Sequence, residues 1–262
     1  MDITVTAALI TVTAGVAMGW INNVAGGAGV FAFWAFQYVC GLPLSIANPS
    51  TRLGAVGVGV FAWLGFLRAG VRIPRRAWMM ALCSIPGAFA GNLLALKAND
   101  LAFRVYLGSV LLLLLWRQLR RKAGDDERPL ATWIGIPGSF LVGVHMGFAQ
   151  VGTGFVAALV LLASYSRDFV QTNAAKSAIV IASSIASLLG FVLAPYVLEQ
   201  QKPVIAWTPA ICLALGTATG SFLASRWTVS KGSAVVRRVV LLIAALALLD
   251  QVVQIVRLLA AH

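Results

Sequence analysis

Long apolar stretches separated by short polar turns run through the whole chain. Several of them approach the ~20 residues that a helix needs to cross a bilayer, and they lack the alternation of a barrel strand. Because only helices and closed barrels satisfy the backbone inside lipid, each stretch is predicted to be helical. The predicted segments are residues 3–22, 28–40, 50–67, 77–96, 101–119, 131–149, 153–164, 171–198, 205–224 and 234–260.

The composition places these helices in a membrane. Of the 262 residues, 60% are hydrophobic and 11% are charged, whereas a soluble domain usually carries about 25% charged residues. We therefore predict an all-α polytopic membrane protein. The net charge of +12 comes from basic clusters between apolar stretches, which is typical of residues flanking membrane spans. The lipid bilayer, and not nucleic acid, is the expected partner.

The chain divides into two halves whose motifs correspond. The most polar stretch separates them, which gives a first repeat at 1–120, a linker at 121–130 and a second repeat at 131–262. Each half has four or five apolar segments, and the second of them is short. Small residues four apart suit close helix packing, which is the role expected for the glycine pairs. The matched positions are Gly15 with Gly143, Gly19 with Gly147, Gly87 with Gly216, Gly91 with Gly220, Asn48 with Asn173, and Arg52 with Lys176.

Basic residues predict that the two repeats are inverted. The turn after segment 50–67 holds four arginines, whereas the matching turn holds only Lys202. The next turn reverses this, with two basic residues in the first half and four in the second. Basic loops stay on the cytoplasmic side, so matching loops lie on opposite sides, the linker is cytoplasmic and both termini are periplasmic. Two spans or one re-entrant hairpin at the start of each half fit equally well.

Glycine-rich breaks at matching positions of two inverted repeats indicate a secondary transporter with its site between the repeats. Glycine lets the backbone approach a ligand, and a helix that starts after it directs free N–H groups towards an anion. The candidate residues at the two breaks are Asn22, Asn23, Gly26, Gly27, Gly29, Gln150, Gly152, Thr153 and Gly154.

A second candidate element is the stretch 47–52. Asn48 and Pro49 suit the cap and first position of a helix, so a helix is predicted to start there and its counterpart near Thr172. Arg52 and Lys176 then lie about one turn inside matching helices, where a buried charge is costly and suggests function. They are expected to balance a substrate anion, or alternatively to reach the headgroups. The further candidates here are Asn48, Ser50, Thr51, Arg52, Asn173 and Lys176.

Other chemistry is sparse. His145 lies in the middle of an apolar segment, where a packing histidine is favoured over a proton relay. Cys40, Cys83 and Cys212 lie in apolar stretches without metal-ligand spacing and are expected to pack as small apolar residues. G-x-S-x-G, HExxH and Walker-type motifs are absent from the sequence, so no catalytic residue, metal or cofactor is expected and an enzyme is disfavoured.

The glycine cluster after the first segment, followed by Gly41-Leu42-Pro43-Leu44-Ser45-Ile46-Ala47 and an Asn-plus-basic helix start, resembles the sulfite exporter TauE/SafE family. The duplication and the chain length also fit. The resemblance implies a transporter of the bacterial inner membrane that exports sulfite or an organosulfonate such as sulfoacetate. Import of another sulfur anion such as thiosulfate, with a role for the three cysteines, is the alternative.

Overall fold

The computed structural model describes residues 3–24, 27–120, 131–166, 168–197 and 204–230, together with 245, 248, 249, 252, 253, 256 and 257. All regular secondary structure in these residues is helical, as predicted. The linker 121–130, Gly26 and most of segment 234–260 lie outside the described residues. The elements are α1 (Val5–Val24), α2 (Gly29–Trp34), a π-helical turn (Ala35–Val39), α3 (Leu44–Arg68), α4 (Arg75–Lys97), α5 (Asp100–Arg120), a 3₁₀ turn (Thr132–Ile134), α6 (Gly135–Phe148), α7 (Thr153–Ser164), α8 (Phe169–Val197) and α9 (Trp207–Ser230).

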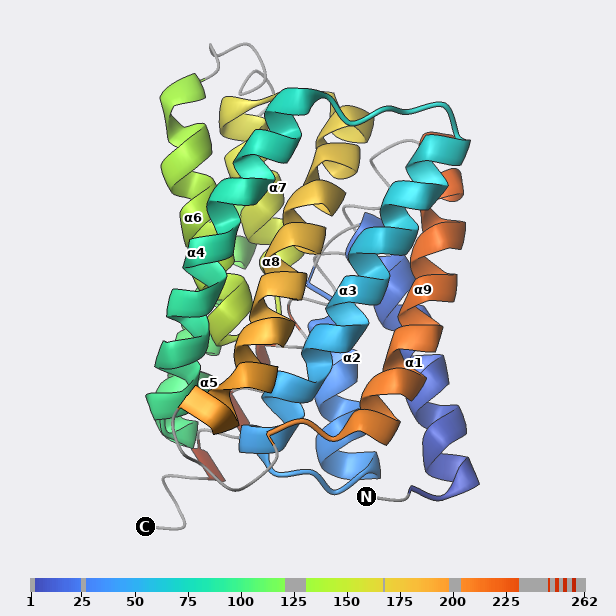
Figure 1. Ribbon diagram of the computed structural model, residues 1–262, viewed down its shortest axis with the longest axis vertical. Coiled ribbons are helices and arrows are strands. Elements are labelled where there is room, and N and C mark those ends of the chain that lie inside the picture. The colour runs from blue at the N-terminus through green and yellow to red at the C-terminus, as the bar shows by residue number, and fades with distance from the viewer. Residues whose placement is uncertain are drawn as a thin grey trace.

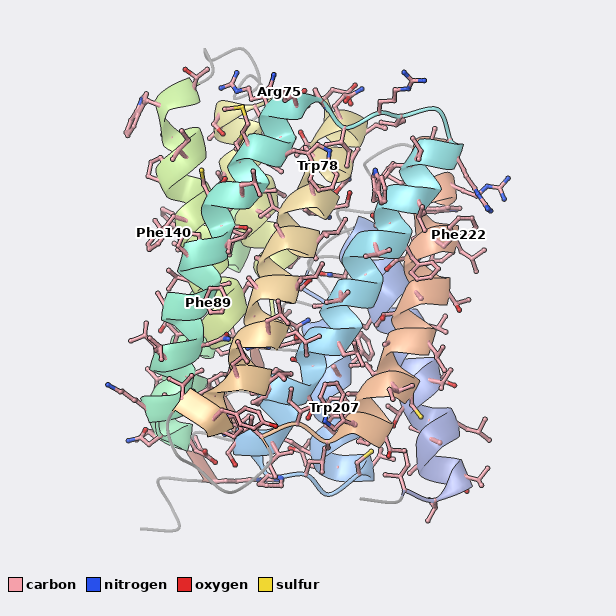
Figure 2. All side chains as sticks on the ribbon, in the orientation of Figure 1. Arg75, Trp78, Phe89, Phe140, Trp207 and Phe222 are labelled. Atoms are coloured by element: carbon pink, nitrogen blue, oxygen red, sulfur yellow. The ribbon has the colours of Figure 1, made fainter. Side chains whose placement is uncertain are left out.

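Five of the described helices are long and apolar enough to cross a membrane. They cover Val5–Asn23, Leu44–Arg68, Arg75–Lys97, Val170–Val197 and Trp207–Val229. The shorter apolar helices Gly29–Val39 and Thr153–Ser164 coincide with the short segments expected in each half. Large apolar side chains, among them Phe89 and Phe140, lie exposed on the outside of the bundle, as lipid contact requires (Figure 2). The protein is therefore a multi-pass helical membrane protein.

The first and fourth α-helices of the two halves pack crosswise. Helix α1 lies along α9 and α6 lies along α4, while α3 and α8 meet each other in the middle of the bundle (Figure 1). Glycines form both crosswise contacts, because a Cβ atom added at any of them would collide with the backbone of the partner helix. The predicted packing role of the glycine pairs is thus confirmed. The contacts join Gly15 and Gly19 to Gly216 and Gly220, and Gly87 and Gly91 to Gly143 and Gly147.

Matching helices of the two halves run in opposite directions. Helices α3 and α8 are antiparallel (Figure 1), and the first residues of α4 and α9, Arg75 and Trp207, lie at opposite ends of the bundle (Figure 2). The arginine-rich turn after α3 lies at the same end as the last turns of α9, since the Arg68 guanidinium lies 5.2 Å from the centre of the Phe222 ring. An inverted repeat requires these directions, and the duplication itself stays a prediction.

Two helices begin earlier than predicted. Helix α3 begins at Leu44 rather than at Asn48, because the Pro43 carbonyl already accepts the N–H groups of Ile46 and Ala47. Pro49 lies inside the helix, where it removes a single main-chain donor. Helix α8 begins at Phe169 rather than near Thr172, because the Asp168 carboxylate accepts the Gln171 N–H at 2.7 Å and caps the helix.

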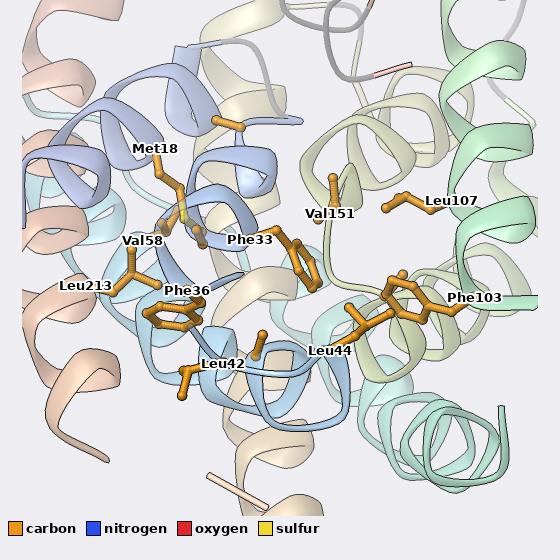
Figure 3. Close-up of a cluster of buried hydrophobic side chains, with 14 residues drawn as sticks. Met18, Phe33, Phe36, Leu42, Leu44, Val58, Phe103, Leu107, Val151 and Leu213 are labelled. Atoms are coloured by element: carbon orange, nitrogen blue, oxygen red, sulfur yellow. The ribbon is translucent and has the colours of Figure 1, made fainter. Parts of the chain in front are cut away.

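An apolar cluster surrounds the short helix α2. Phe33 and Phe36 are buried there between α1, α3, α5 and the segment that joins α6 to α7 (Figure 3). The rings of Phe33 and Phe103 lie 5.9 Å apart, and Val151 of the connecting segment belongs to the same cluster. A helix of six residues is not stable alone, so this packing holds the first break against the second.

Candidate functional site

The two breaks meet each other, as the repeat pattern predicts for a site. Helix α1 ends at Val24 and α2 begins at Gly29, while α6 ends at Phe148 and α7 begins at Thr153. A Cβ atom at Gly29 would lie 3.0 Å from a methyl group of Val151. Gly27, at φ +85°, lies against the Phe155 ring with no room for a side chain. Both glycines are therefore needed for the close approach of the two segments.

The second break turns within four residues. Gly152 has φ +85°, and Gln150 has φ +61°, a left-handed conformation that costs a residue with a side chain about 1 kcal/mol or more. The Thr153 hydroxyl donates to the Gln150 carbonyl at 2.6 Å. The first N–H groups of α7 donate to the Gln150 and Gly152 carbonyls, and Gly154 is buried in that first turn. The Thr153 hydroxyl and these N–H groups, which were predicted to bind the substrate, therefore bond carbonyls of the chain itself.

The helix starts predicted at Asn48 and near Thr172 do not join the two breaks. Helices α3 and α8 begin at opposite ends of the bundle (Figure 1), so only the starts of α2 and α7 lie where the breaks meet. The helices begin about one turn before the predicted positions. Asn48, Arg52, Asn173 and Lys176 consequently lie farther inside α3 and α8, where Arg52 and Lys176 bond the ends of the interrupted helices.

Arg52 is completely buried, with 0% of its surface exposed, which contradicts the headgroup alternative. Its Nη2 donates to the Gly147 carbonyl at 2.9 Å, at the C-terminal end of α6. A cation there satisfies carbonyls without intrahelical partners and opposes the helix dipole. All five of its N–H groups are occupied by protein acceptors, which are Ser187 Oγ, Asn48 O, Thr51 Oγ1, Asn48 Oδ1 and Gly147 O.

Lys176 has the corresponding role at the end of α1. Its Nζ donates to the Asn22 and Asn23 carbonyls, each at 3.1 Å, and 4% of its surface is exposed. Each buried cation thus binds the C-terminal end of the interrupted helix from the other half. An ammonium group has three N–H donors, and the third has no acceptor among the described residues. Among these residues no carboxylate pairs with Lys176 either.

The asparagines that precede these cations differ. The Asn48 amide donates to the Phe148 carbonyl at 2.9 Å and its Oδ1 accepts from Arg52. Asn173 is equally buried, at 2% exposed, and its Nδ2 has no partner in the described part of the chain. The same is true of Gln150 Oε1 at the second break. Unpaired buried polar atoms are rare in folded proteins and need an explanation.

Other predicted site residues hold the scaffold together. The Ser50 hydroxyl donates to Ile46 and accepts the Ala206 N–H, which joins α3 to the segment before α9. Thr51 donates to Asn48. Asn23 donates through its amide to the Ser221 carbonyl on α9 at 2.8 Å. The Asn22 carbonyl accepts a hydrogen bond from Lys176 Nζ.

His145 is held on both ring nitrogens. Because a carbonyl only accepts, Nε2 carries the proton that bonds the Val151 oxygen at 2.8 Å, and Nδ1 accepts from the Tyr106 hydroxyl at 2.8 Å. This arrangement favours the packing interpretation. The three cysteines form no disulfide and are partly buried. In the described residues no group of His, Cys, Asp and Glu is placed to hold a metal ion.

Two residues of the Arg52 network are absent from the predicted set. Ser187 donates to Asn92 Oδ1 at 2.6 Å, and the Asn92 amide returns a hydrogen bond to the Ser187 carbonyl at 2.7 Å. They link α4 and α8 to the arginine on α3. The signal in the sequence is Asn92 itself, a lone amide directly after the Gly87-x3-Gly91 pair in an otherwise apolar helix.

A multi-pass helical bundle with two interrupted segments in contact is the architecture of a membrane transporter. The family model for the sulfite exporter TauE/SafE matches residues 11–250, and the chain belongs to this family. It is 24% identical over 246 residues to a probable membrane transporter protein of Haemophilus influenzae, covering 92% of this chain and 93% of the relative. It is also 24% identical to the probable membrane transporter protein YfcA of Escherichia coli K12, covering 87% and 82%. No solved structure matches the chain.

Proposed function

We propose that this transporter exports a small sulfur oxyanion, sulfite first or an organosulfonate such as sulfoacetate, across the bacterial inner membrane by alternating access. The observation that carries the proposal is the buried Lys176, which lies beside the first break with a spare donor and no carboxylate partner among the described residues. Burying such a charge is costly, and a substrate anion provides the missing counter-charge. The family name supports a sulfur oxyanion as that substrate.

The membrane potential is sufficient to drive export. An inside-negative potential favours the outward movement of an anion by about 2.3 kcal/mol per charge for each 100 mV. No coupling ion is required on physical grounds. The two repeats, 1–120 and 131–262, would then move relative to each other around the meeting point of the breaks.

The basic end of the bundle gives the proposed orientation. Arg68, Arg72, Arg75 and Arg76 gather at the turn between α3 and α4, and the positive-inside rule places this end in the cytoplasm. In this orientation the linker 121–130 is cytoplasmic and both termini are periplasmic. Labelling of single cysteines added at residues 70 and 99, on the two sides of α4, tests the assignment in intact cells.

Efflux from proteoliposomes tests the function. The purified protein is reconstituted with sulfite inside, and efflux is followed under an imposed potential, with sulfate as the control anion. The proposal predicts that sulfite leaves faster when the potential favours anion exit and that sulfate moves little. Efflux that requires a pH gradient would reject the uncoupled mechanism. Sulfite that stays inside under both gradients would reject the substrate.

A further inference from the structure

The two halves place similar side chains at matching positions and use them differently. In the first half, Asn48 and Arg52 lie one turn apart on α3, and in the second half Asn173 and Lys176 lie about one turn apart on α8. Residues three or four apart share one face of a helix. Both pairs therefore place an amide and a cation on one face of their helix, and each cation bonds the interrupted helix of the other half.

The cation of the α3 pair has no donor left for a ligand, and the Asn48 amide keeps one of its two N–H groups among the described residues. The guanidinium fills all five N–H groups with protein acceptors, and the Asn48 amide uses both its oxygen and its nitrogen within the protein. The Phe191 ring also covers the guanidinium, at 5.3 Å. An anion could reach Arg52 only by breaking several of these buried bonds, each of which is costly to lose.

The pair on α8 has unused donors. Nδ2 of Asn173 has no partner in the described chain although the residue is 2% exposed, and Lys176 keeps a third N–H beyond its two carbonyl acceptors. Both unused groups are donors, and one carries a full positive charge. A ligand that accepts hydrogen bonds and carries negative charge fits this pair, whereas a cation does not.

We propose that the transporter binds its anion in the second half only, at Lys176 Nζ and Asn173 Nδ2, and that Arg52 with Asn48 is a positioning pair that holds the end of α6. The identity of the anion as sulfite rests on the proposed function above. The asymmetry between the halves does not rest on it, because it follows from which donors have no acceptor among the described residues.

The matched variants Asn173→Ala and Asn48→Ala test this asymmetry in the purified full chain. Calorimetric titration with sulfite measures affinity, and the melting temperature measures stability. Asn173→Ala is expected to weaken sulfite binding by about tenfold, the value of one hydrogen bond to a charged group, without a loss of stability. Asn48→Ala is expected to lower the melting temperature, because it leaves Arg52 and Phe148 short of a partner, and to keep the wild-type affinity.

A second pair of variants tests the asymmetry without any ligand. Replacing an unpaired buried amide by an apolar side chain of similar size is neutral or stabilising, whereas replacing a paired one leaves its partners unsatisfied. Asn173→Leu is therefore expected to keep or raise the melting temperature, and Asn48→Leu to lower it. Equal losses in the two leucine variants, or equal losses of affinity in the two alanine variants, would overturn the asymmetry.

A panel of anions tests the identity of the substrate separately from the location of the binding site. Sulfite, thiosulfate, methanesulfonate and sulfate are each added to the wild type and to Asn173→Ala, and the rise in melting temperature is measured. If only another anion raises the melting temperature, and Asn173→Ala abolishes that rise, the proposed site is retained and sulfite is rejected as its ligand. A rise with sulfite that Asn173→Ala retains keeps the proposed function and rejects the site. No rise with any anion rejects both.

Discussion

Lys176 on α8 donates a hydrogen bond to the backbone carbonyl of Asn23 at the end of α1, 3.1 Å away. The two residues are 153 positions apart and belong to different halves of the chain. Arg52 binds the end of α6 in the same crosswise manner. Each half thus supplies a cation that fixes the interrupted helix of the other, and a movement of the halves must change these contacts.

Removing the Arg52 side chain is expected to destabilise the protein strongly. Arg52→Met leaves two α6 carbonyls, Ser187 and Asn48 without their donor, and breaking a buried charged network from one side costs about 3–5 kcal/mol. The measurement is unfolding in detergent by denaturant, with Arg72→Met at the exposed turn as the control. An Arg52→Met protein as stable as the control would show that the network contributes nothing to the fold.

The two glycine contacts are expected to be equally sensitive. Gly87→Ala on α4 and Gly216→Ala on α9 each force a methyl group into the partner helix, and overpacking costs about 1–3 kcal/mol. Melting temperatures measure the effect. Gly70→Asn is the control, because that position has φ +83° with open space around it and asparagine tolerates this conformation. Alanine variants that melt like the control contradict the packing.

His145 is expected to stabilise the second break and to relay no proton. His145→Phe removes the donor to Val151 and the acceptor for Tyr106, which costs about 1–3 kcal/mol. Tyr106→Phe removes only the second of these bonds and is the milder control. Sulfite efflux by Tyr106→Phe is expected to remain independent of an imposed pH gradient, as in the wild type. A gradient that accelerates efflux in the wild type and not in His145→Phe would establish the relay.

The cysteines are expected to be dispensable. Cys40, Cys83 and Cys212 form no disulfide and are partly buried. An oxyanion bound by amide and ammonium donors needs no thiol. The triple alanine variant is predicted to keep its sulfite efflux per folded protein, with a modest loss of stability from the smaller side chains. Loss of transport with retained folding, together with uptake of thiosulfate by the wild type, would favour the thiol-dependent importer.

The fold class was readable from the sequence because lipid leaves few choices. A long apolar stretch must be a helix, and a stretch as short as 153–164 must be an interruption. The glycine pairs were readable because small residues four apart have a packing role whichever helix they meet. The start of α3 could not be predicted in this way, because Pro43 and Pro49 both suit a helix start and the Pro43 carbonyl accepts the first N–H groups of the folded helix.

The different roles of the two cations could not be predicted from the sequence. Arg52 and Lys176 occupy matching positions, and both donate to main-chain carbonyls, which every residue carries. Ser187, whose hydroxyl oxygen accepts the hydrogen bond of Arg52 Nε–H, is 135 residues away. Only the folded chain shows that the Asn48 amide is paired, whereas Asn173 Nδ2 has no partner among the described residues.

The charge of Lys176 is the central element of the proposed transport mechanism. The decisive measurement is potential-driven sulfite efflux from proteoliposomes containing the wild type, Lys176→Met or Lys97→Met, each normalised to folded protein. We predict that Lys176→Met loses at least about 100-fold of the flux, the equivalent of one buried ion pair of ~3 kcal/mol, while Lys97→Met at the end of α4 keeps it. Wild-type flux in Lys176→Met would contradict the account.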